Sequence, residues 1–321
     1  MRTSFLAVIT LAILSQAAHA NYALFDKETD TIQIDGDTVL GSAATYEARI
    51  YILGAGGRIF NEWRLAAEDK MLDFANGELR AYSFDVNRGN SFTAPITPSL
   101  RTWHHFAYVY DGSEERLYLD GQAINQRAAS GNIRDSVSSV ASMGGFMREG
   151  FRSSFIGLMD TFRVSSIARY SGTSFDVPTG DLVSDADTQL LFNFTESPGS
   201  LTVTNLGQAT ATGVLGSGYE AATSPLLVTD LPASGDLDYD GFVGITDLNL
   251  VLASWNQAVS PGDPADPTGD NFIGIEDLNI VMGNWNAGTP PASSTVPEPG
   301  TLALLSMGAM GLIQRSRQAR H

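Results

Sequence analysis

Trp103-His104-His105-Phe106-Ala107-Tyr108-Val109-Tyr110, followed by Asp111-Gly112-Ser113-Glu114 and then Arg116-Leu117-Tyr118-Leu119, is the stretch that decides the fold. Two runs of alternating apolar residues flank a turn that contains Asp-Gly, and this arrangement is a strong short-range signal for a β-hairpin. A second pair, Asp120-Gly121, ends the return strand. The stretch therefore predicts two antiparallel strands joined by a tight turn.

Further short alternating segments lie on both sides of this hairpin, separated by Gly, Asp, Asn and Ser. We expect strands at residues 45–53, 57–65, 78–84, 103–110, 116–119, 155–164 and 189–194. Strands at such spacing indicate a β-sandwich or jelly roll. One helical turn is expected at 166–170.

The hairpin and two later segments resemble laminin G-like, concanavalin A-like jelly-roll domains. Phe155-Ile156-Gly157-Leu158-Met159-Asp160-Thr161-Phe162-Arg163-Val164 is similar to their late core strand, and Asp187-Thr188-Gln189-Leu190-Leu191-Phe192-Asn193-Phe194 to their penultimate strand. The resemblance implies a mainly β fold, a concanavalin A-like jelly-roll sandwich, at 21–227. It implies little about function, because these motifs are mostly core and turn residues.

The composition is that of a folded protein without disulfides, and it leaves the compartment undecided. Hydrophobic residues make up 43% of the 321 residues and charged residues 17%, with 32 glycines, which suits a turn-rich β structure. The net charge of −17 argues against nucleic acid as a partner and favours cations. The absence of cysteine excludes thiolate zinc sites and Cys nucleophiles.

The N-terminus reads as a secretory signal peptide at 1–20. Arg2 gives a positive start, residues 5–14 form an apolar run, and Ala18-His19-Ala20 is a small-x-small site with cleavage after Ala20. The mature chain then begins near Asn21. The alternative is a buried N-terminal helix or strand.

Residues 235–289 contain a tandem loop-helix repeat. The calcium-ligand positions of the first loop, 1, 3, 5, 7 and 12, are Asp236, Asp238, Asp240, Phe242 and Asp247, with Gly241 at position 6. This is the EF-hand spacing with Asp in place of the final Glu, and it brings carboxylates together because alternate residues of a tight loop converge. Thr246 can cap the following helix, whose expected apolar face is Leu248, Val251, Leu252 and Trp255.

The second copy begins thirty residues later. Its ligand positions are Asp266, Thr268, Asp270, Phe272 and Asp277, with Asn271 at position 6, and its helix face is Leu278, Val281, Met282 and Trp285. Nine acids and no Lys or Arg lie between Gly235 and Pro290, so a cation is needed to balance them. We expect the first loop to bind Ca2+ more tightly, because the second has lost a carboxylate at Thr268 and the glycine at Asn271. The alternative is a pair of polar loops that only join helices.

These repeats resemble type I dockerins, which pair two such units and dock onto cohesin modules. The resemblance implies a small α-helical dockerin-like calcium module. Those dockerins usually carry a Ser or Thr pair before the final loop Asp and basic residues along the helix, whereas this chain has Ile245-Thr246 and Ile275-Glu276 and no basic residue there. This departure argues against a cohesin partner.

The C-terminal residues 296–321 resemble a PEP-CTERM sorting signal. Pro297-Glu298-Pro299 follows a linker at 290–295 and precedes an apolar run at 301–313. Three arginines, at positions 315, 317 and 320, follow the run. The resemblance implies processing by an exosortase and a transient membrane anchor, because the apolar run is short for a stable span. The chain is therefore expected to be secreted or held at the cell surface; the alternative is an amphipathic tail.

Catalytic motifs are missing from the sequence. The Glu-x-Asp-x-x-Glu run of retaining β-glucanases does not occur, and isolated acids such as Glu47, Glu62 and Asp160 cannot be paired from sequence. His104 and His105 point to opposite faces of one strand, so they cannot hold one ion. We therefore expect a non-catalytic surface or matrix protein whose jelly roll binds carbohydrate or a protein partner. The alternatives are an extracellular polysaccharide-degrading enzyme or its accessory, and an inert structural component. A linker at 228–234 is expected to join the jelly roll to the repeats.

Overall fold

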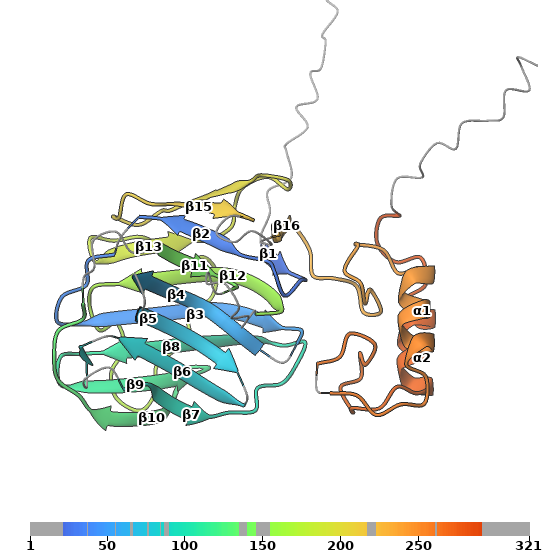
Figure 1. Cartoon of the computed structure of the whole chain (residues 1–321), viewed down its shortest axis with the longest axis horizontal. Coiled ribbons are helices and arrows are strands. Elements are labelled where there is room, and N and C mark those ends of the chain that lie inside the picture. Colours follow the sequence, from blue (N-terminus) through green and yellow to red (C-terminus); the bar gives the residue numbers. More distant parts are fainter. Residues whose placement is uncertain are drawn as a thin grey trace, which may run out of the picture.

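The structure is a computed structural model of the whole chain. It describes residues 22–36, 38–54, 56–64, 67–75, 77–83, 85–86, 90–134, 140–145, 155–216, 223–260 and 262–290. Two antiparallel sheets pack face to face, and a pair of short helices lies beside them (Figure 1). The jelly-roll sandwich expected from the sequence is confirmed.

The first sheet is built around the diagnostic hairpin. Its strand order is β10 (Gln122–Ala128), β9 (Glu114–Leu119), β8 (Trp103–Tyr110), β3 (Ala44–Ile52), β12 (Gly157–Ser165), β1 (Tyr22–Phe25) and β16 (Leu226–Val228), and β13 (Thr188–Phe192) also pairs with β12. Tyr110 lies opposite Glu115, and the Asp111 N–H donates to the Glu114 carbonyl at 3.1 Å, so the predicted hairpin is confirmed.

The second Asp-Gly pair continues the sheet. Asp120 and Gly121 have φ angles of +50° and +76°, the left-handed values that a tight hairpin turn requires, and they lead from β9 directly into β10. The third strand of this group, β10, was not expected from the sequence, which predicts only the end of the return strand at this pair.

The second sheet covers the other side of the core. Its order is β14 (Thr202–Thr204), β15 (Thr212–Leu215), β2 (Ile32–Asp35), β11 (Val140–Met143), β4 (Gly56–Arg64), β5 (Ala67–Ala75), β6 (Glu78–Ser83) and β7 (Phe92–Pro95). Strand β5 was not expected from the sequence, because Lys70 and Asp73 interrupt its apolar pattern although both are buried.

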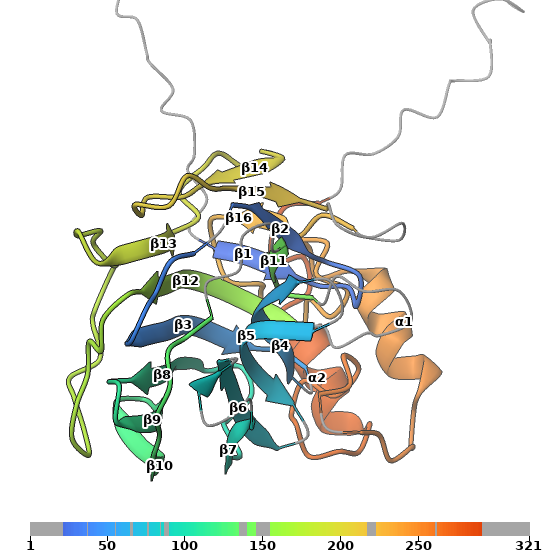
Figure 2. The same cartoon turned by 60° about the vertical axis from the view of Figure 1, so that its left-hand side comes forward.

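The core between the sheets is rich in aromatic rings. Phe60 of β4 and Phe162 of β12 have ring centroids 4.8 Å apart, and Phe74 of β5 meets Phe106 of β8 edge-on at 5.7 Å. Such pairs combine a large buried apolar area with favourable ring geometry. Figure 2 shows the two layers that these side chains join.

The repeat module contains α1 (Ile245–Ala253) and α2 (Ile275–Gly283). Its own core is Leu237, Val243, Val251, Ala265, Ile273 and Val281. Two isolated antiparallel bridges, Phe242 with Gly288 and Ala258 with Phe272, tie each loop to the segment after the other helix. The repeats therefore fold as one symmetric pair.

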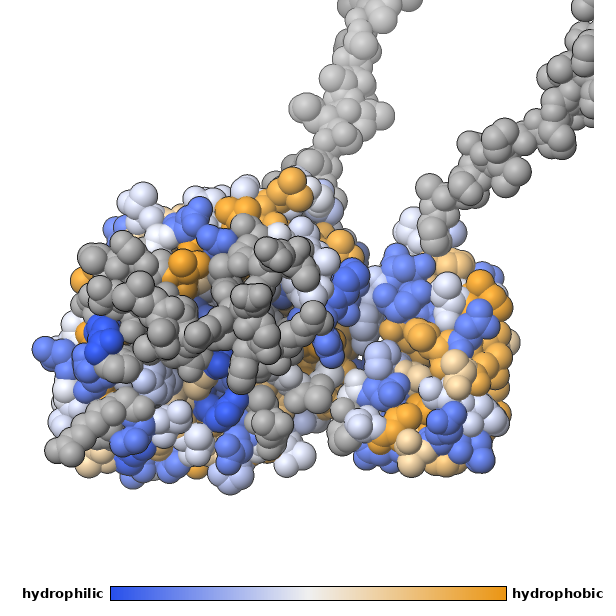
Figure 3. All heavy atoms as spheres, in the orientation of Figure 1, coloured by the Kyte–Doolittle hydropathy of each residue, from blue (hydrophilic) through white to orange (hydrophobic). Residues whose placement is uncertain are grey.

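Two local expectations for these helices were wrong. Thr246 does not cap α1, because the helix already begins at Ile245 and Thr246 lies within its first turn. The N-cap is Gly244, whose N–H donates to the Asp247 carboxylate at 2.7 Å. Val251 and Val281 face the core as expected, but Leu252, Trp255, Met282 and Trp285 are exposed. Nine-residue helices that pack mainly through one valine each leave these outer positions uncovered, and Figure 3 shows apolar surface on this module.

The expected signal peptide with its site at Ala20, and the Pro297-Glu298-Pro299 motif, lie outside the described residues. Within the described ranges, no helix is long and apolar enough to cross a membrane. The predicted helical turn at 166–170 is absent, since this part of the chain follows β12 as an irregular segment.

Candidate metal centre

Three carboxylates of the first loop converge on one point. One oxygen from each of Asp236, Asp238 and Asp240 lies within 4.8 Å of the other two. The alternating spacing predicted this convergence. Asp236 is buried, Asp238 is half-buried and Asp240 is exposed, so the cluster opens to solvent on one side.

Asp247 connects the loop to the helix. It is fully buried, one of its oxygens accepts the Leu237 N–H at 2.6 Å, and the other accepts the Gly244 N–H at 2.7 Å. The residue at loop position 12 therefore holds the start of the loop and caps α1. Phe242, at position 7, donates its N–H to Asp240 at 2.9 Å.

Asp236 carries an unsatisfied charge. Its Oδ2 accepts the Gly241 N–H at 3.1 Å, whereas its buried Oδ1 accepts no hydrogen bond from the residues that the structure describes. Burial, followed by the nearby Asp247 charge, raises the pKa of Asp236 to about 7. A hard cation would relieve both penalties, and an all-oxygen, carboxylate-rich set suits Ca2+.

The second loop has the same outline with different chemistry. The Thr268 hydroxyl lies 2.8 Å from Asp266 and 2.9 Å from Asp277, and the Asn271 N–H donates to Asp266 at 2.7 Å. Phe272 donates its N–H to Asp270 at 2.8 Å. In the part of the chain that the structure describes, only the first loop forms a three-carboxylate cluster.

The backbone of the two loops agrees at both turning points. Position 6 is left-handed in both, with φ of +87° at Gly241 and +67° at Asn271. Asparagine adopts this conformation more readily than other non-glycine residues, so Asn271 preserves the turn. Position 4 is also left-handed, with φ of +58° at Tyr239 and +77° at Gly269.

The neighbouring histidines of β8 contact different partners. His104 Nδ1 lies 2.8 Å from Asp120, and His105 Nε2 lies 3.1 Å from Glu47 on the other side of the strand. Their opposite orientation agrees with the period of a strand.

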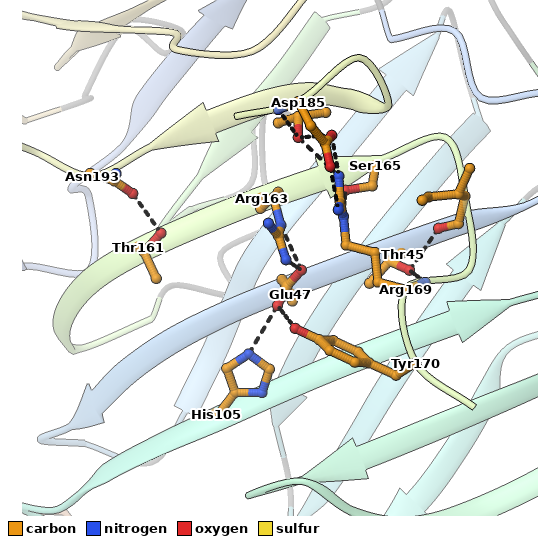
Figure 4. A network of polar contacts seen from close by, with 12 residues as sticks. Thr45, Glu47, His105, Thr161, Arg163, Ser165, Arg169, Tyr170, Asp185 and Asn193 are labelled. Atoms are coloured by element: carbon orange, nitrogen blue, oxygen red, sulfur yellow. Dashed lines mark hydrogen bonds and ion pairs between the residues drawn. The ribbon is translucent and has the colours of Figure 1, made fainter. Parts of the chain in front are cut away.

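Glu47 organises a buried polar network on the outer side of the first sheet (Figure 4). Arg163 Nη2 lies 2.7 Å from it, and the Tyr170 hydroxyl donates to it at 2.7 Å. Burial raises its pKa, but the His105 hydrogen bond and the Arg163 charge outweigh that effect and place the pKa below its usual value. Tyr170 also stacks on Phe175 at 3.6 Å, so the network attaches the segment after β12 to the sheet.

A second polar group lies on the outward face of the second sheet. Asp73 of β5 lies opposite Arg80 of β6 and contacts it at 2.9 Å, and Arg58 of β4 approaches Asp73 at 3.4 Å. Asn61 accepts a hydrogen bond from Ser142 at 2.9 Å.

Three atoms of this outer polar group are buried and have no hydrogen-bond partner in the described structure: Asn61 Nδ2, Asp73 Oδ1 and Arg80 Nε. Sequence reasoning missed the group, because pairing register brings together residues that no motif connects.

Two family models match the chain. Residues 26–171 match the Laminin_G_3 model, described as the Concanavalin A-like lectin/glucanases superfamily, and residues 295–318 match the PEP-CTERM protein-sorting motif. Neither model covers the loop-helix repeats. No curated protein matches the chain.

Solved structures resemble the chain at low identity. A heptameric SAP-like pentraxin from Limulus polyphemus is 15% identical, with a TM-score of 0.38, over 48% of this chain and 78% of that one. A "putative carbohydrate binding protein" from Bacteroides ovatus is 13% identical, with a TM-score of 0.43, over 66% and 62%. Domains LG4-5 of the mouse laminin alpha1 chain are 15% identical, with a TM-score of 0.37, over 52% and 48%. These similarities do not identify a ligand.

The family matches fall on two parts of the chain. The superfamily match at 26–171 lies within the two-sheet sandwich, and the sorting-motif match at 295–318 contains the Pro297-Glu298-Pro299 sequence. The chain carries a laminin G-like, concanavalin A-like domain and a PEP-CTERM signal, and it is an exported protein that is processed by exosortase and anchored at the cell surface.

Proposed function

We propose that this protein is a non-catalytic, calcium-binding surface protein whose jelly roll binds carbohydrate. The observation that carries the calcium assignment is the buried Oδ1 of Asp236, which has no hydrogen-bond partner among the described residues and lies in a cluster with Asp238 and Asp240. Uncompensated buried carboxylates are costly, and a bound cation offsets that cost. Asp236, Asp238, Asp240, Phe242 and Asp247 would hold the ion in the first loop.

The second loop is proposed as a weaker site. Asp266, Thr268, Asp270, Phe272 and Asp277 would hold its ion. The Thr268 hydroxyl already contacts Asp266 and Asp277, so less unsatisfied charge remains for an ion to relieve.

Thermal unfolding of the mature chain with Ca2+ and with chelator tests the calcium assignment. Ca2+ should raise the melting temperature of the repeat module in the wild type, and Asp236→Asn should remove most of that rise. Asp230→Asn, an exposed aspartate outside both loops, is the matched control and should behave as the wild type. A wild type whose melting temperature and helical circular dichroism ignore Ca2+ would refute the assignment.

The proposed carbohydrate site is the outer polar group of the second sheet. Sugar hydroxyls both donate and accept, and they can satisfy an amide donor, a carboxylate acceptor and a guanidinium donor at once. Asn61 Nδ2, Asp73 Oδ1 and Arg80 Nε provide this combination on one face of the sheet, and the partly exposed Arg80 side chain is the point at which a sugar would reach it. The half-buried Tyr82 lies on the same face, opposite Met71.

A glycan array probed with the mature chain tests this site. Binding should be lost in Arg80→Gln and retained in Arg134→Gln, which alters an arginine whose partner Asp85 is exposed at the surface. Circular dichroism of both variants checks that the sheets remain intact. Binding that survives Arg80→Gln would place the ligand elsewhere, and reducing-sugar release from a bound polysaccharide would overturn the non-catalytic assignment.

A further inference from the structure

The side chain of Tyr239, a residue of the first loop, packs against the jelly roll. It occupies loop position 4 and is only 6% exposed. The buried residues that cluster with it all come from the sandwich: Leu24, Leu53 and Leu158. Partly buried apolar side chains surround this cluster: Tyr22, Tyr51, Trp103, Ile156 and Val228. The loop that gathers the carboxylates therefore also contributes the central side chain of an interdomain contact.

The jelly roll presents an ordered surface to this tyrosine. The Trp103 ring lies 5.1 Å from the Tyr22 ring and 5.4 Å from the Tyr51 ring, and the Arg49 guanidinium lies 4.8 Å above it. Burial raises the pKa of Tyr239, and the charge of the nearby Arg101 opposes that rise. The tyrosine therefore combines a buried apolar ring with a hydroxyl near a cationic side chain.

The backbone conformation of Tyr239 is unfavourable for a tyrosine, which indicates that the packing of its ring compensates for the strain. Its φ of +58° lies in the left-handed region, which is costly for a bulky residue. The equivalent residue of the second loop is Gly269, with a φ of +77°, and glycine adopts this conformation freely. The first loop therefore has a strained backbone at a position whose side chain packs against the jelly roll.

Tyr239 lies between two of the proposed calcium ligands. The carboxylates of Asp238 and Asp240 join the cluster, whereas the intervening side chain packs against the sandwich. A backbone that positions both carboxylates on an ion therefore also directs Tyr239 into its contact. Figure 1 shows the repeat module beside the jelly roll.

We propose that the first loop is a calcium-dependent latch between the repeat module and the jelly roll, a role that rests on the calcium function proposed above. Calcium holds the loop in the conformation that docks Tyr239, and docking in turn raises the affinity of the loop for calcium. The two effects must be equal, because coupling between two binding events is reciprocal. The second loop, with Gly269 in place of the tyrosine, binds its ion without this coupling.

Calorimetric titration of the mature chain with CaCl2 tests the latch. Tyr239→Asn keeps a residue that tolerates the left-handed backbone but removes the ring, and it should weaken the tight site by about tenfold, a typical coupling. Leu53→Ala, on the jelly roll and away from the carboxylates, should weaken the same site in the same direction. Gly269→Asn is the matched control in the second loop and should leave the tight site unchanged.

Small-angle X-ray scattering of the same proteins supplies an independent reading. With Ca2+, the wild type and Gly269→Asn should be compact, and Tyr239→Asn should have the larger radius of gyration that chelator produces in the wild type. Unchanged calcium affinity in both Tyr239→Asn and Leu53→Ala would overturn the latch and leave the calcium site standing. A wild type that binds no calcium would overturn the calcium function itself.

Discussion

The two loops of the repeat module share a backbone and differ in chemistry. Positions 4 and 6 are left-handed in both, and the final aspartate of each accepts the N–H of the residue that caps its helix at 2.7 Å. The first loop has a carboxylate at position 3 and a buried oxygen without a described partner, whereas the second has the Thr268 hydroxyl between two carboxylates. The two loops therefore share their backbone conformation and differ in how much uncompensated carboxylate charge an ion would relieve.

The largest effect should follow removal of the final aspartate of each loop, which holds the loop backbone by hydrogen bonds and is also a proposed calcium ligand. Asp247→Ala leaves the buried N–H groups of Leu237 and Gly244 unpaired, and each costs about 1–3 kcal/mol, so the module should lose about 3 kcal/mol of stability in chelator. Asp277→Ala should cost a similar amount, because the Gly274 N–H and the Thr268 N–H and hydroxyl lose their contacts with this carboxylate. Denaturant unfolding measures both.

In Ca2+ these two variants should separate. Asp247→Ala should lose a further stabilisation that Asp277→Ala largely retains, because the tight site lies in the first loop. Equal losses in Ca2+ would show that the loops are equivalent.

The next largest effect, on calcium affinity, should come from exchanging the residues at position 3 of the two loops. Thr268→Asp gives the second loop an acidic side chain at position 3, as the first loop has, and we expect its calcium affinity to rise about tenfold, because affinity in such loops follows the ligand charge. Asp238→Thr should weaken the first loop correspondingly. Calorimetric titration distinguishes the two sites, and an unchanged second site in Thr268→Asp would show that position 3 does not account for the difference.

A smaller effect should appear as a pH dependence confined to the first loop. Without Ca2+, the pKa of Asp236 is raised to about 7, above its value in the unfolded chain. The folded state then binds the proton more tightly, so the stability of the module should fall as pH rises from about 4 to about 7. Asp236→Asn should flatten this profile, and Ca2+ should oppose it. Thermal unfolding across this range measures the slope, and a wild-type profile that rises with pH would contradict the assignment.

The smallest effect should come from position 6 of the second loop. Asn271→Gly replaces one residue that tolerates positive φ with another, so stability and calcium affinity should change by less than about 1 kcal/mol. A large gain in affinity would mean that the missing glycine, and not the missing carboxylate, weakens the second loop.

The predictable features of this protein are local in sequence. Asp111-Gly112 located the central hairpin, and the alternation of Asp236, Asp238 and Asp240 located the carboxylate cluster. Both depend on residues a few positions apart, whose geometry follows from backbone period and turn preference.

The features that sequence reasoning missed depend on distant pairing. Strand β5 was hidden by Lys70, which is buried beside Glu62 at 2.8 Å, a partner that only the strand register supplies. The contact of Tyr239 with Leu24 and Leu158 joins residues far apart in the chain, and no spacing rule connects them. The sequence does place a tyrosine at a loop position where the sister repeat has Gly269, and that difference was an available signal.

The most direct test of the difference between the loops is a calcium titration followed by the amide resonances of Gly241 and Asn271. These residues occupy position 6 of the two loops, and each donates its N–H to the first aspartate of its own loop, at 3.1 Å and 2.7 Å. The Gly241 resonance should saturate at a lower calcium concentration than the Asn271 resonance. Saturation of Asn271 first, of both together, or of neither would contradict the account.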